Sequence, residues 1–107
     1  MKTEKLRLLY LPCGSLADAK RIGRILVEEK LAACVNIVPR VHSIFREKQR
    51  VKSVVEALLL AKVPKQKQTA VTRRIQALHS YDVPCICFYE AESVNPDYLN
   101  WVHESLR

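Results

Sequence analysis

Residues 26–39, LVEEKLAACVNIVP, contain the point at which a helix gives way to a strand. Apolar residues recur with the helical period up to Leu31, and from Cys34 onward they alternate, which is typical of a strand with one buried face. Neither glycine nor serine separates the two patterns. A connection this short restricts how the helix can lie, so the stretch predicts a helix packed on a β-sheet.

The chain before this stretch predicts one strand and the body of that helix. Residues 6–11 are apolar at almost every position, as in a central strand covered on both faces. Ser15 is the expected N-cap of a helix over residues 16–31. Gly23 would let this helix approach the sheet closely. The expected inner stripe is Ala19, Ile22, Gly23 and Leu26.

Residues 34–46 and 51–63 predict two long strands joined by the polar tip at residues 47–50. Pro39 cannot donate to a β-ladder, which predicts a bulge or an edge position there. The hairpin is longer than a small sheet requires, so we expect its outer half to pack on a neighbouring subunit. Alternation places on one face of the first strand Val35, Ile37, Pro39, Val41 and Phe45.

The rest of the chain predicts a helix, a strand and a final helix. Pro64 is expected to begin the second helix, which ends near Leu78. Residues 83–89 are rich in β-branched and aromatic residues, which favours a strand. Residues 95–97, Asn-Pro-Asp, combine three signals of a helix start. The order β-α-β-β-α-β plus a helix predicts an α+β, ferredoxin-like fold in a single domain over residues 1–107.

The net charge of +7 and the four cysteines limit the function classes. A basic field attracts phosphate, but the lysines and arginines are scattered without a long basic run, so nucleic acid is not the favoured partner. The cysteines form no C-x-x-C pair, which argues against a zinc ribbon or a thioredoxin-like motif. We therefore expect free thiols and a cytoplasmic location. No apolar run is long enough to cross a membrane.

Three segments of the chain match a known family in order and spacing. They are residues 26–39, the combination of EALLLAK at 56–62 with HSYDVP at 79–84, and NPDYLNW at 95–101. Together they resemble the CutA family, the divalent-cation tolerance proteins. The resemblance implies a compact homotrimer, similar in arrangement to PII signalling proteins, whose long hairpin extends onto a neighbour. It also implies tolerance of divalent metal, copper above all. We expect no catalysis and no required cofactor, with copper as the divalent metal that the chain could bind.

The chain departs from the common family pattern at positions linked with copper. Members often carry Tyr-Trp-Glu-Gly near the hairpin tip, whereas residues 46–49 here are Arg-Glu-Lys-Gln. The family's copper-linked cysteine and histidine correspond to Leu11 and Leu78. These differences argue against a high-affinity copper site of that type.

Glu56 and Lys62 are the first candidates for ligand contacts. They share a face of the expected third strand, with leucines between them. A charge on a largely apolar strand needs a partner or solvent, so the two line an inter-subunit cleft that holds a cation or small anionic ligand, or they form structural ion pairs. Trp101 is a packing anchor at an interface or a further wall of the ligand site.

A second group of candidates follows the second helix. His79 and Tyr81 could bind metal or move protons, and the alternative is that His79 stabilises the helix C-terminus. Cys85 and Cys87 alternate onto one face of the predicted strand, and with His79 they could hold copper(I) or zinc, unless they are core residues. The predicted ligand-binding set is Glu56, Lys62, His79, Tyr81 and Trp101. The predicted metal set is His79, Cys85 and Cys87.

Three functions compete at this stage. The favoured one is a trimeric metal-tolerance protein that binds a cation or small ligand between subunits and is not an enzyme. The second is a PII-like signalling or assembly adaptor that presents the tip at residues 47–50. The third is an RNA-binding module, which shares the element order but needs aromatic residues on the first and third strands, where Tyr10 stands alone.

Overall fold

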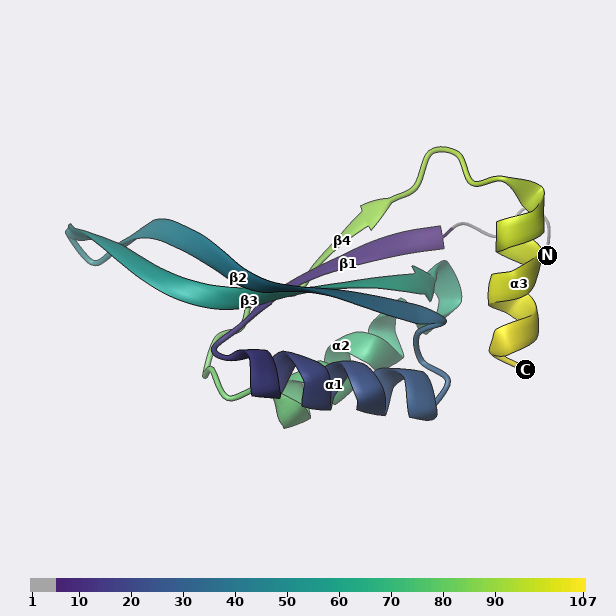
Figure 1. The fold of residues 1–107 in the computed structure, drawn as a ribbon, viewed down its shortest axis with the longest axis horizontal. Coiled ribbons are helices and arrows are strands. Elements are labelled where there is room, and N and C mark those ends of the chain that lie inside the picture. Colours follow the sequence, from purple (N-terminus) through teal and green to yellow (C-terminus); the bar gives the residue numbers. More distant parts are fainter. Residues whose placement is uncertain (1–5) are drawn as a thin grey trace.

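The structure, a computed structural model, describes residues 6–107 and shows a four-stranded antiparallel sheet with two helices on one face (Figure 1). The strands are β1 (Leu6–Cys13), β2 (Cys34–Glu47), β3 (Arg50–Pro64) and β4 (Cys87–Glu90). The helices are α1 (Leu16–Glu28), α2 (Gln68–Leu78) and α3 (Pro96–Ser105), with a short 3-10 helix η1 (Lys65–Lys67) before α2. The strand order β2-β3-β1-β4 is that of the predicted α+β, ferredoxin-like fold.

Helix α1 forms and packs as the sequence predicts. The Ser15 Oγ accepts a hydrogen bond from the Asp18 N–H at 3.1 Å, which caps the helix N-terminus. All members of the predicted inner stripe are buried against the sheet. The core between the sheet and helices α1 and α2 is centred on Leu9, Leu11, Ile22, Leu26, Leu59, Val63, Val71 and Ile75.

The end of α1 differs from the prediction. The helix ends at Glu28, before the predicted end at Leu31. The Lys30 N–H donates to the Val27 carbonyl at 3.0 Å and the Leu31 N–H donates to the Leu26 carbonyl at 2.8 Å. These two bonds form a Schellman motif, with Lys30 in the left-handed conformation at φ 60°. The tight connection to β2 is therefore built without glycine.

The long β2–β3 hairpin is present, and it carries the predicted bulge. The register shifts between Val38 and Val41, and β2 is also an edge strand. Beyond the shift, Val41 pairs with Glu56 and Phe45 pairs with Lys52. The prediction of a single face for Val41, Phe45 and Ile37 is wrong, because the extra residue of a bulge reverses the alternation. Figure 1 shows the outer half of the hairpin extending beyond the helices.

Two further boundaries differ from the sequence prediction. Pro64 ends β3 with an extended backbone, and α2 begins only at Gln68, after η1. Strand β4 begins at Cys87 rather than at residue 83, so Cys85 lies outside the strand. Pro84, which cannot donate to a β-ladder, lies three residues before Cys87, the first residue of β4 that pairs with β1. Helix α3 begins with Pro96 as expected, although Asn95 makes no side-chain capping bond.

The sheet face opposite α1 and α2 is here called the open face. In the described part of the chain, α3 lies at one end of the open face, and no helix covers the centre of that face (Figure 1). The strand pairings place Asn36, Leu60, Tyr10 and Cys87 in one row across this face. The row beside it is Cys34, Lys62, Leu8 and Tyr89. The open face is therefore mainly apolar, with few polar groups at its ends.

Candidate functional site

Glu56, His79 and Tyr81 lie together at the end of β1 and are here called the Glu56 cluster. The Tyr81 hydroxyl donates to the Glu56 Oε2 at 2.7 Å, and the Tyr81 N–H donates to the His79 Nδ1 at 3.1 Å. The two rings lie 4.7 Å apart. Gly14 makes room for Tyr81, since a Cβ on that glycine would lie 3.3 Å from the Tyr81 ring. The loop after α2 therefore joins three predicted ligand-binding residues.

Both ring nitrogens of His79 are engaged. Nδ1 accepts the Tyr81 N–H, so Nε2 carries the proton and donates to the Pro12 carbonyl at 2.9 Å. Binding of a metal to either nitrogen would break one of these bonds. The geometry thus gives His79 the role of holding the loop on the end of β1.

Tyr81 remains a hydrogen-bond donor over the physiological range. Burial and then the hydrogen bond to Glu56 raise the pKa of Tyr81 to about 12. The phenol therefore holds the carboxylate of Glu56 in one orientation. Among residues 6–107, the other carboxylate oxygen of Glu56 has no hydrogen-bond partner, and it can accept from a ligand or bind a cation.

Cys85 and Cys87 lie beside each other, with their Sγ atoms 3.7 Å apart. Cys85 is exposed and Cys87 is half-buried at the start of β4. Burial, then the contact with Cys87 and the charge of Glu56, raise the pKa of the Cys85 thiol. Within residues 6–107, no three His, Cys, Asp or Glu side chains are placed to hold a metal ion. The predicted set of His79, Cys85 and Cys87 is therefore not assembled within one chain.

Lys62 and Trp101 belong to a separate group, here called the Lys62 cluster, with Asn36 and Tyr98. The Lys62 Nζ donates to the Asn36 Oδ1 at 2.8 Å and lies 5.9 Å from the centre of the Tyr98 ring. The Tyr98 and Trp101 rings of α3 lie 5.5 Å apart. A pocket of about 300 Å³ lies next to Lys62 and Tyr98.

Sequence reasoning missed Asn36 and Tyr98. Tyr98 belongs to the segment NPDYLNW at residues 95–101, and Asn36 is the polar residue in the alternating part of residues 26–39. Neither could be linked with Lys62 before the strand register was known. The pairing of Asn36 with Leu60 places it diagonally beside Lys62 on the open face.

The two clusters lie at different ends of the open face. Glu56 and Lys62 share that face, as predicted, because each has the parity of Leu58 and Leu60 on β3. Six residues of strand separate them by about 20 Å, and each has its own partner. Glu56 and Lys62 therefore do not line one common cleft within a single chain.

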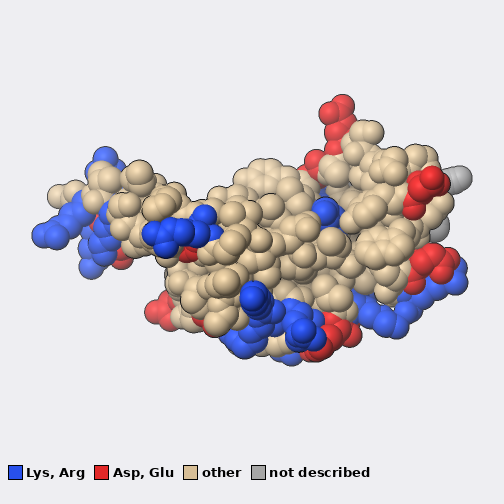
Figure 2. All heavy atoms as spheres, viewed as in Figure 1, with Lys and Arg blue, Asp and Glu red and all other residues tan. Residues whose placement is uncertain are grey.

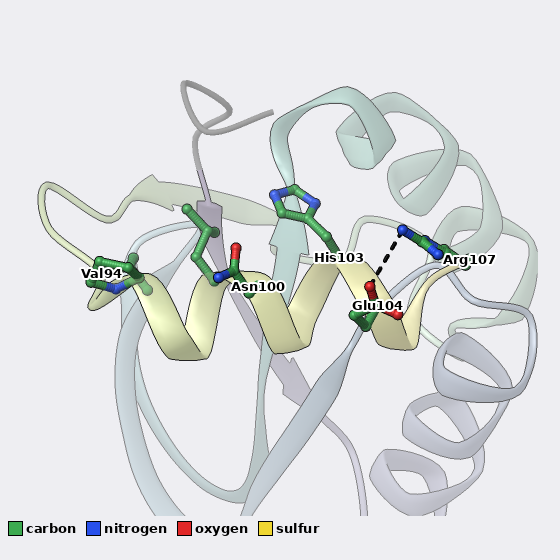
Figure 3. Close-up of a pocket in the computed structure, with 7 residues that line it drawn as sticks. Val94, Asn100, His103, Glu104 and Arg107 are labelled. Carbon is green, nitrogen blue, oxygen red and sulfur yellow. Dashed lines mark ion pairs between the residues drawn. The ribbon is translucent and has the colours of Figure 1, made fainter.

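A larger hollow, of about 680 Å³, follows α3 on the outside of the molecule. Its lining includes Leu99, Asn100 and His103, and Figure 3 shows the ion pair between Glu104 and Arg107 near the helix C-terminus, where the two charges lie 3.3 Å apart. None of the predicted site residues lines it.

The surface charge is uneven. Figure 2 shows lysine and arginine side chains gathered at the outer end of the hairpin and along the helix side of the molecule. At the hairpin end these are Arg46, Lys48, Arg50 and Lys52. Among the helices of residues 6–107, none combines the length and apolar character needed to span a bilayer.

Residues 7–105 match the family described as CutA1 divalent ion tolerance protein. The divalent-cation tolerance protein CutA of Archaeoglobus fulgidus is 36% identical over 98 residues, which are 92% of this chain and 95% of that protein. The CutA homolog of Xenopus laevis is 40% identical over 93 residues, and this chain spans only 62% of that relative's length.

Solved structures agree with the sequence comparison. The crystal structure of the divalent ion tolerance protein CutA1 from Ehrlichia chaffeensis superimposes with a TM-score of 0.92 at 30% identity, covering 97% of both chains. The names of relatives mention more than one compartment: periplasmic for an Archaeoglobus fulgidus structure and chloroplastic for a rice protein. The fold, the order of the motifs and the matched length all agree, and the chain belongs to the CutA1 divalent ion tolerance family.

Proposed function

We propose that this chain is a non-catalytic metal-tolerance protein that assembles as a homotrimer and binds a divalent cation or a small anionic ligand in clefts between subunits. The observation that supports this most is the separation of the Glu56 cluster from the Lys62 cluster on one open face. Each cluster presents a charged group that is held by an aromatic hydroxyl or ring. Each is half of a site within one chain.

The apolar surface of the chain supports the assembly. Tyr10 and Tyr89 are 38% and 57% exposed on the open face, and their rings lie 6.5 Å apart. On the hairpin, Ile44 and Val51 are 72% and 65% exposed. The strand register places the tyrosines on the open face and the two hairpin residues on the opposite face. Groups of large exposed apolar side chains on a soluble protein mark interfaces. A second copy of this chain is the occupant that offers the same apolar surface in return.

A head-to-tail contact would join the two half-sites. Glu56 lies where the hairpin leaves the body of the sheet, and Lys62 lies at the other end, beside α3. If the hairpin of one copy crosses the open face of the next, the Glu56 cluster of one copy meets the Lys62 cluster of another. Such heterologous contacts close into a ring when the rotation allows it, as in the PII-like trimer that the family resemblance implies.

The donors in the two clusters suit two kinds of ligand. The oriented carboxylate of Glu56 is one donor for a divalent cation. Copper is the cation that we propose to test first, on the family resemblance alone, because a carboxylate does not by itself favour copper. The ammonium group of Lys62, next to the Asn36 amide, suits a carboxylate or phosphate group. His79, which is engaged at both nitrogens, has no free nitrogen with which to carry a proton to a ligand. We also propose a reducing cytoplasmic setting, which all four free cysteines support.

The proposal is tested on the reduced protein by light scattering and by calorimetric titration with Cu²⁺, Zn²⁺ and Ni²⁺. We expect the mass of a trimer, and weaker metal binding by at least about tenfold in Glu56→Gln, because the cleft then lacks its carboxylate. Glu92→Gln is the matched control, since Glu92 is an exposed carboxylate outside both clusters. A monomer at micromolar concentration would remove the clefts and contradict the proposal.

A further inference from the structure

Lys62 is a half-buried cation for which the described residues provide no carboxylate. On the strands of residues 6–107, the half-buried cations are Arg7 and Lys62. The Arg7 Nη1 lies 3.3 Å from the Glu90 Oε1, whereas within residues 6–107 the Lys62 Nζ donates to the neutral amide of Asn36 and has no ion pair. A charge in a largely apolar setting needs a counter-charge or solvent. Lys62 is therefore placed to bind an anion.

The ammonium group of Lys62 is held from two directions. The Asn36 Oδ1 accepts one of its N–H groups at 2.8 Å, and the centre of the Tyr98 ring lies 5.9 Å from the Nζ. The remaining N–H groups of the ammonium are available to a ligand. A donor that is already held in place loses little freedom when a ligand binds.

A pocket of about 300 Å³ opens beside this ammonium group, between the start of β1, the end of β3 and the segment before α3. This volume is at the lower end of the range for ligand sites, so the occupant is small. Asn95 also lines the pocket, and among the described residues its side chain makes no capping bond, which leaves its amide able to donate to an anion. The apolar walls are Leu6, Leu8, Ala91, Val94 and Tyr98.

The charge and the walls of the pocket together favour one class of ligand. Arg7 lines the pocket too, but its charge is balanced by Glu90, so Lys62 supplies the unbalanced positive charge of the described lining. A carboxylate matches a single ammonium group. A phosphate group carries close to two negative charges at neutral pH and is best held by forked arginine donors. The apolar walls favour a ligand whose remaining part is apolar.

We propose that the pocket beside Lys62 binds a small monocarboxylate, with the carboxylate on the Lys62 ammonium group and an apolar body against β1 and the segment before α3. The inference deepens the proposed binding of a small anionic ligand, on which it rests, by naming the class of that ligand. The lining residues belong to one chain, so binding can be measured separately from assembly.

The test is a calorimetric titration of the reduced, metal-free full chain with hexanoate, and with hexanamide as the neutral analogue of the same size. We expect hexanoate to bind at least about tenfold more tightly than hexanamide, because only hexanoate forms a charge-assisted contact with Lys62. Trp101, the only tryptophan of the chain, has its ring 5.5 Å from the Tyr98 ring. Its fluorescence should therefore change along the same titration curve.

Three variants locate the site. Lys62→Met keeps a long side chain without the charge, and it should weaken hexanoate binding by at least about tenfold and abolish the preference over hexanamide. Ala91→Phe should weaken the binding of both compounds, because the larger side chain fills the pocket. Lys67→Met is the matched control, since Lys67 is also half-buried but lies in η1, outside the pocket, and it should leave both titrations unchanged. Circular dichroism of each variant shows that the fold is kept.

Three results would overturn the inference. They are equal binding of hexanoate and hexanamide by the wild-type chain, unchanged hexanoate binding by Lys62→Met, and displacement of hexanoate by an equal concentration of inorganic phosphate. A trimer that binds metal but no hexanoate would contradict this inference and leave the proposed assembly and metal binding intact. A monomer that binds hexanoate with the expected preference would contradict the assembly and leave this pocket intact.

Discussion

Gly23 lies at a close approach of α1 to the sheet. A Cβ at this position would lie 2.9 Å from the Val35 Cγ1, which confirms the close approach predicted from the sequence. In a helix interior, alanine is more favourable than glycine by about 1 kcal/mol. Pressing the new methyl group against the stiff, β-branched side chain of Val35 costs about 1–3 kcal/mol. We expect Gly23→Ala to lower the free energy of unfolding by about 1 kcal/mol, measured by urea denaturation at fixed protein concentration.

The control for this change is the same substitution in a Val35→Ala background. Removing the Val35 methyl groups removes the clash, so Gly23→Ala should then stabilise the protein through its helix propensity. An equal loss of stability in both backgrounds would show that the contact between α1 and β2 is not the cause.

Cys13 makes the stability of the fold depend on pH. It is fully buried, and burial, followed by the charges of Asp18 and Glu56, raises its pKa from 9.0 to about 11. Above pH 9 the unfolded chain loses this proton while the folded chain keeps it, so stability is full below pH 9 and falls as the pH rises toward 11. The loss is about 1.4 kcal/mol per pH unit within that window.

The measurement compares urea unfolding of the reduced wild type and of Cys13→Ala at pH 8 and pH 10. The wild type should lose about 1 kcal/mol more than the variant over this interval, because the other titrating groups are common to both. The same pH dependence in the two proteins would mean that Cys13 ionises as easily in the folded chain as in the unfolded one.

At the scale of the element, the end of α1 stores strain that can be removed. Lys30 adopts the left-handed conformation, which costs a residue with a Cβ about 1 kcal/mol and costs glycine nothing. Lys30→Gly is expected to raise the free energy of unfolding by about 1 kcal/mol in urea denaturation. Lys30→Ala is the matched control, since it removes the same side chain but keeps the Cβ, and it should give no gain. A similar gain from both variants would assign the effect to the lysine side chain.

Local signals predicted the elements well, and long-range contacts account for what they missed. Periodicity and capping residues located α1 and the inner stripe around Gly23, because both depend on neighbours in sequence. The alternation along β2 was wrong beyond Val38, because the partner strand determines where the extra residue of a bulge is placed. Strand β4 is shorter than its composition suggests, because only Cys87–Glu90 find a partner in β1.

In the candidate site too, local sequence signals identified some residues, and long-range contacts determined the others. The sequence singled out Glu56 and Lys62 as charges on an apolar strand, and both lie on the face that was predicted. Their partners, Tyr81 and Asn36, come from other parts of the chain and became visible only in the folded structure. Chemistry that depends on tertiary pairing is not encoded in local spacing.

At the scale of the whole molecule, the projecting hairpin distinguishes a lone chain from an assembly. Ile44 is 72% exposed on the hairpin, and Val83 is 88% exposed in the loop before β4. In a single chain, neither side chain contributes much burial, so a lysine at either position should be tolerated equally. In the proposed trimer, the hairpin packs on a neighbour, and Ile44 then becomes buried.

Ile44→Lys and Val83→Lys therefore form a matched pair that tests the assembly. Losing a buried isoleucine costs about 1.5–3 kcal/mol at each interface, and the charge placed there must also be desolvated. We expect Ile44→Lys to sediment as a monomer or as a mixture at micromolar concentration, with unchanged circular dichroism, and Val83→Lys to sediment as a trimer. If both variants keep the mass of the wild-type protein, Ile44 lies outside the interface, and the hairpin projects for a reason other than self-assembly.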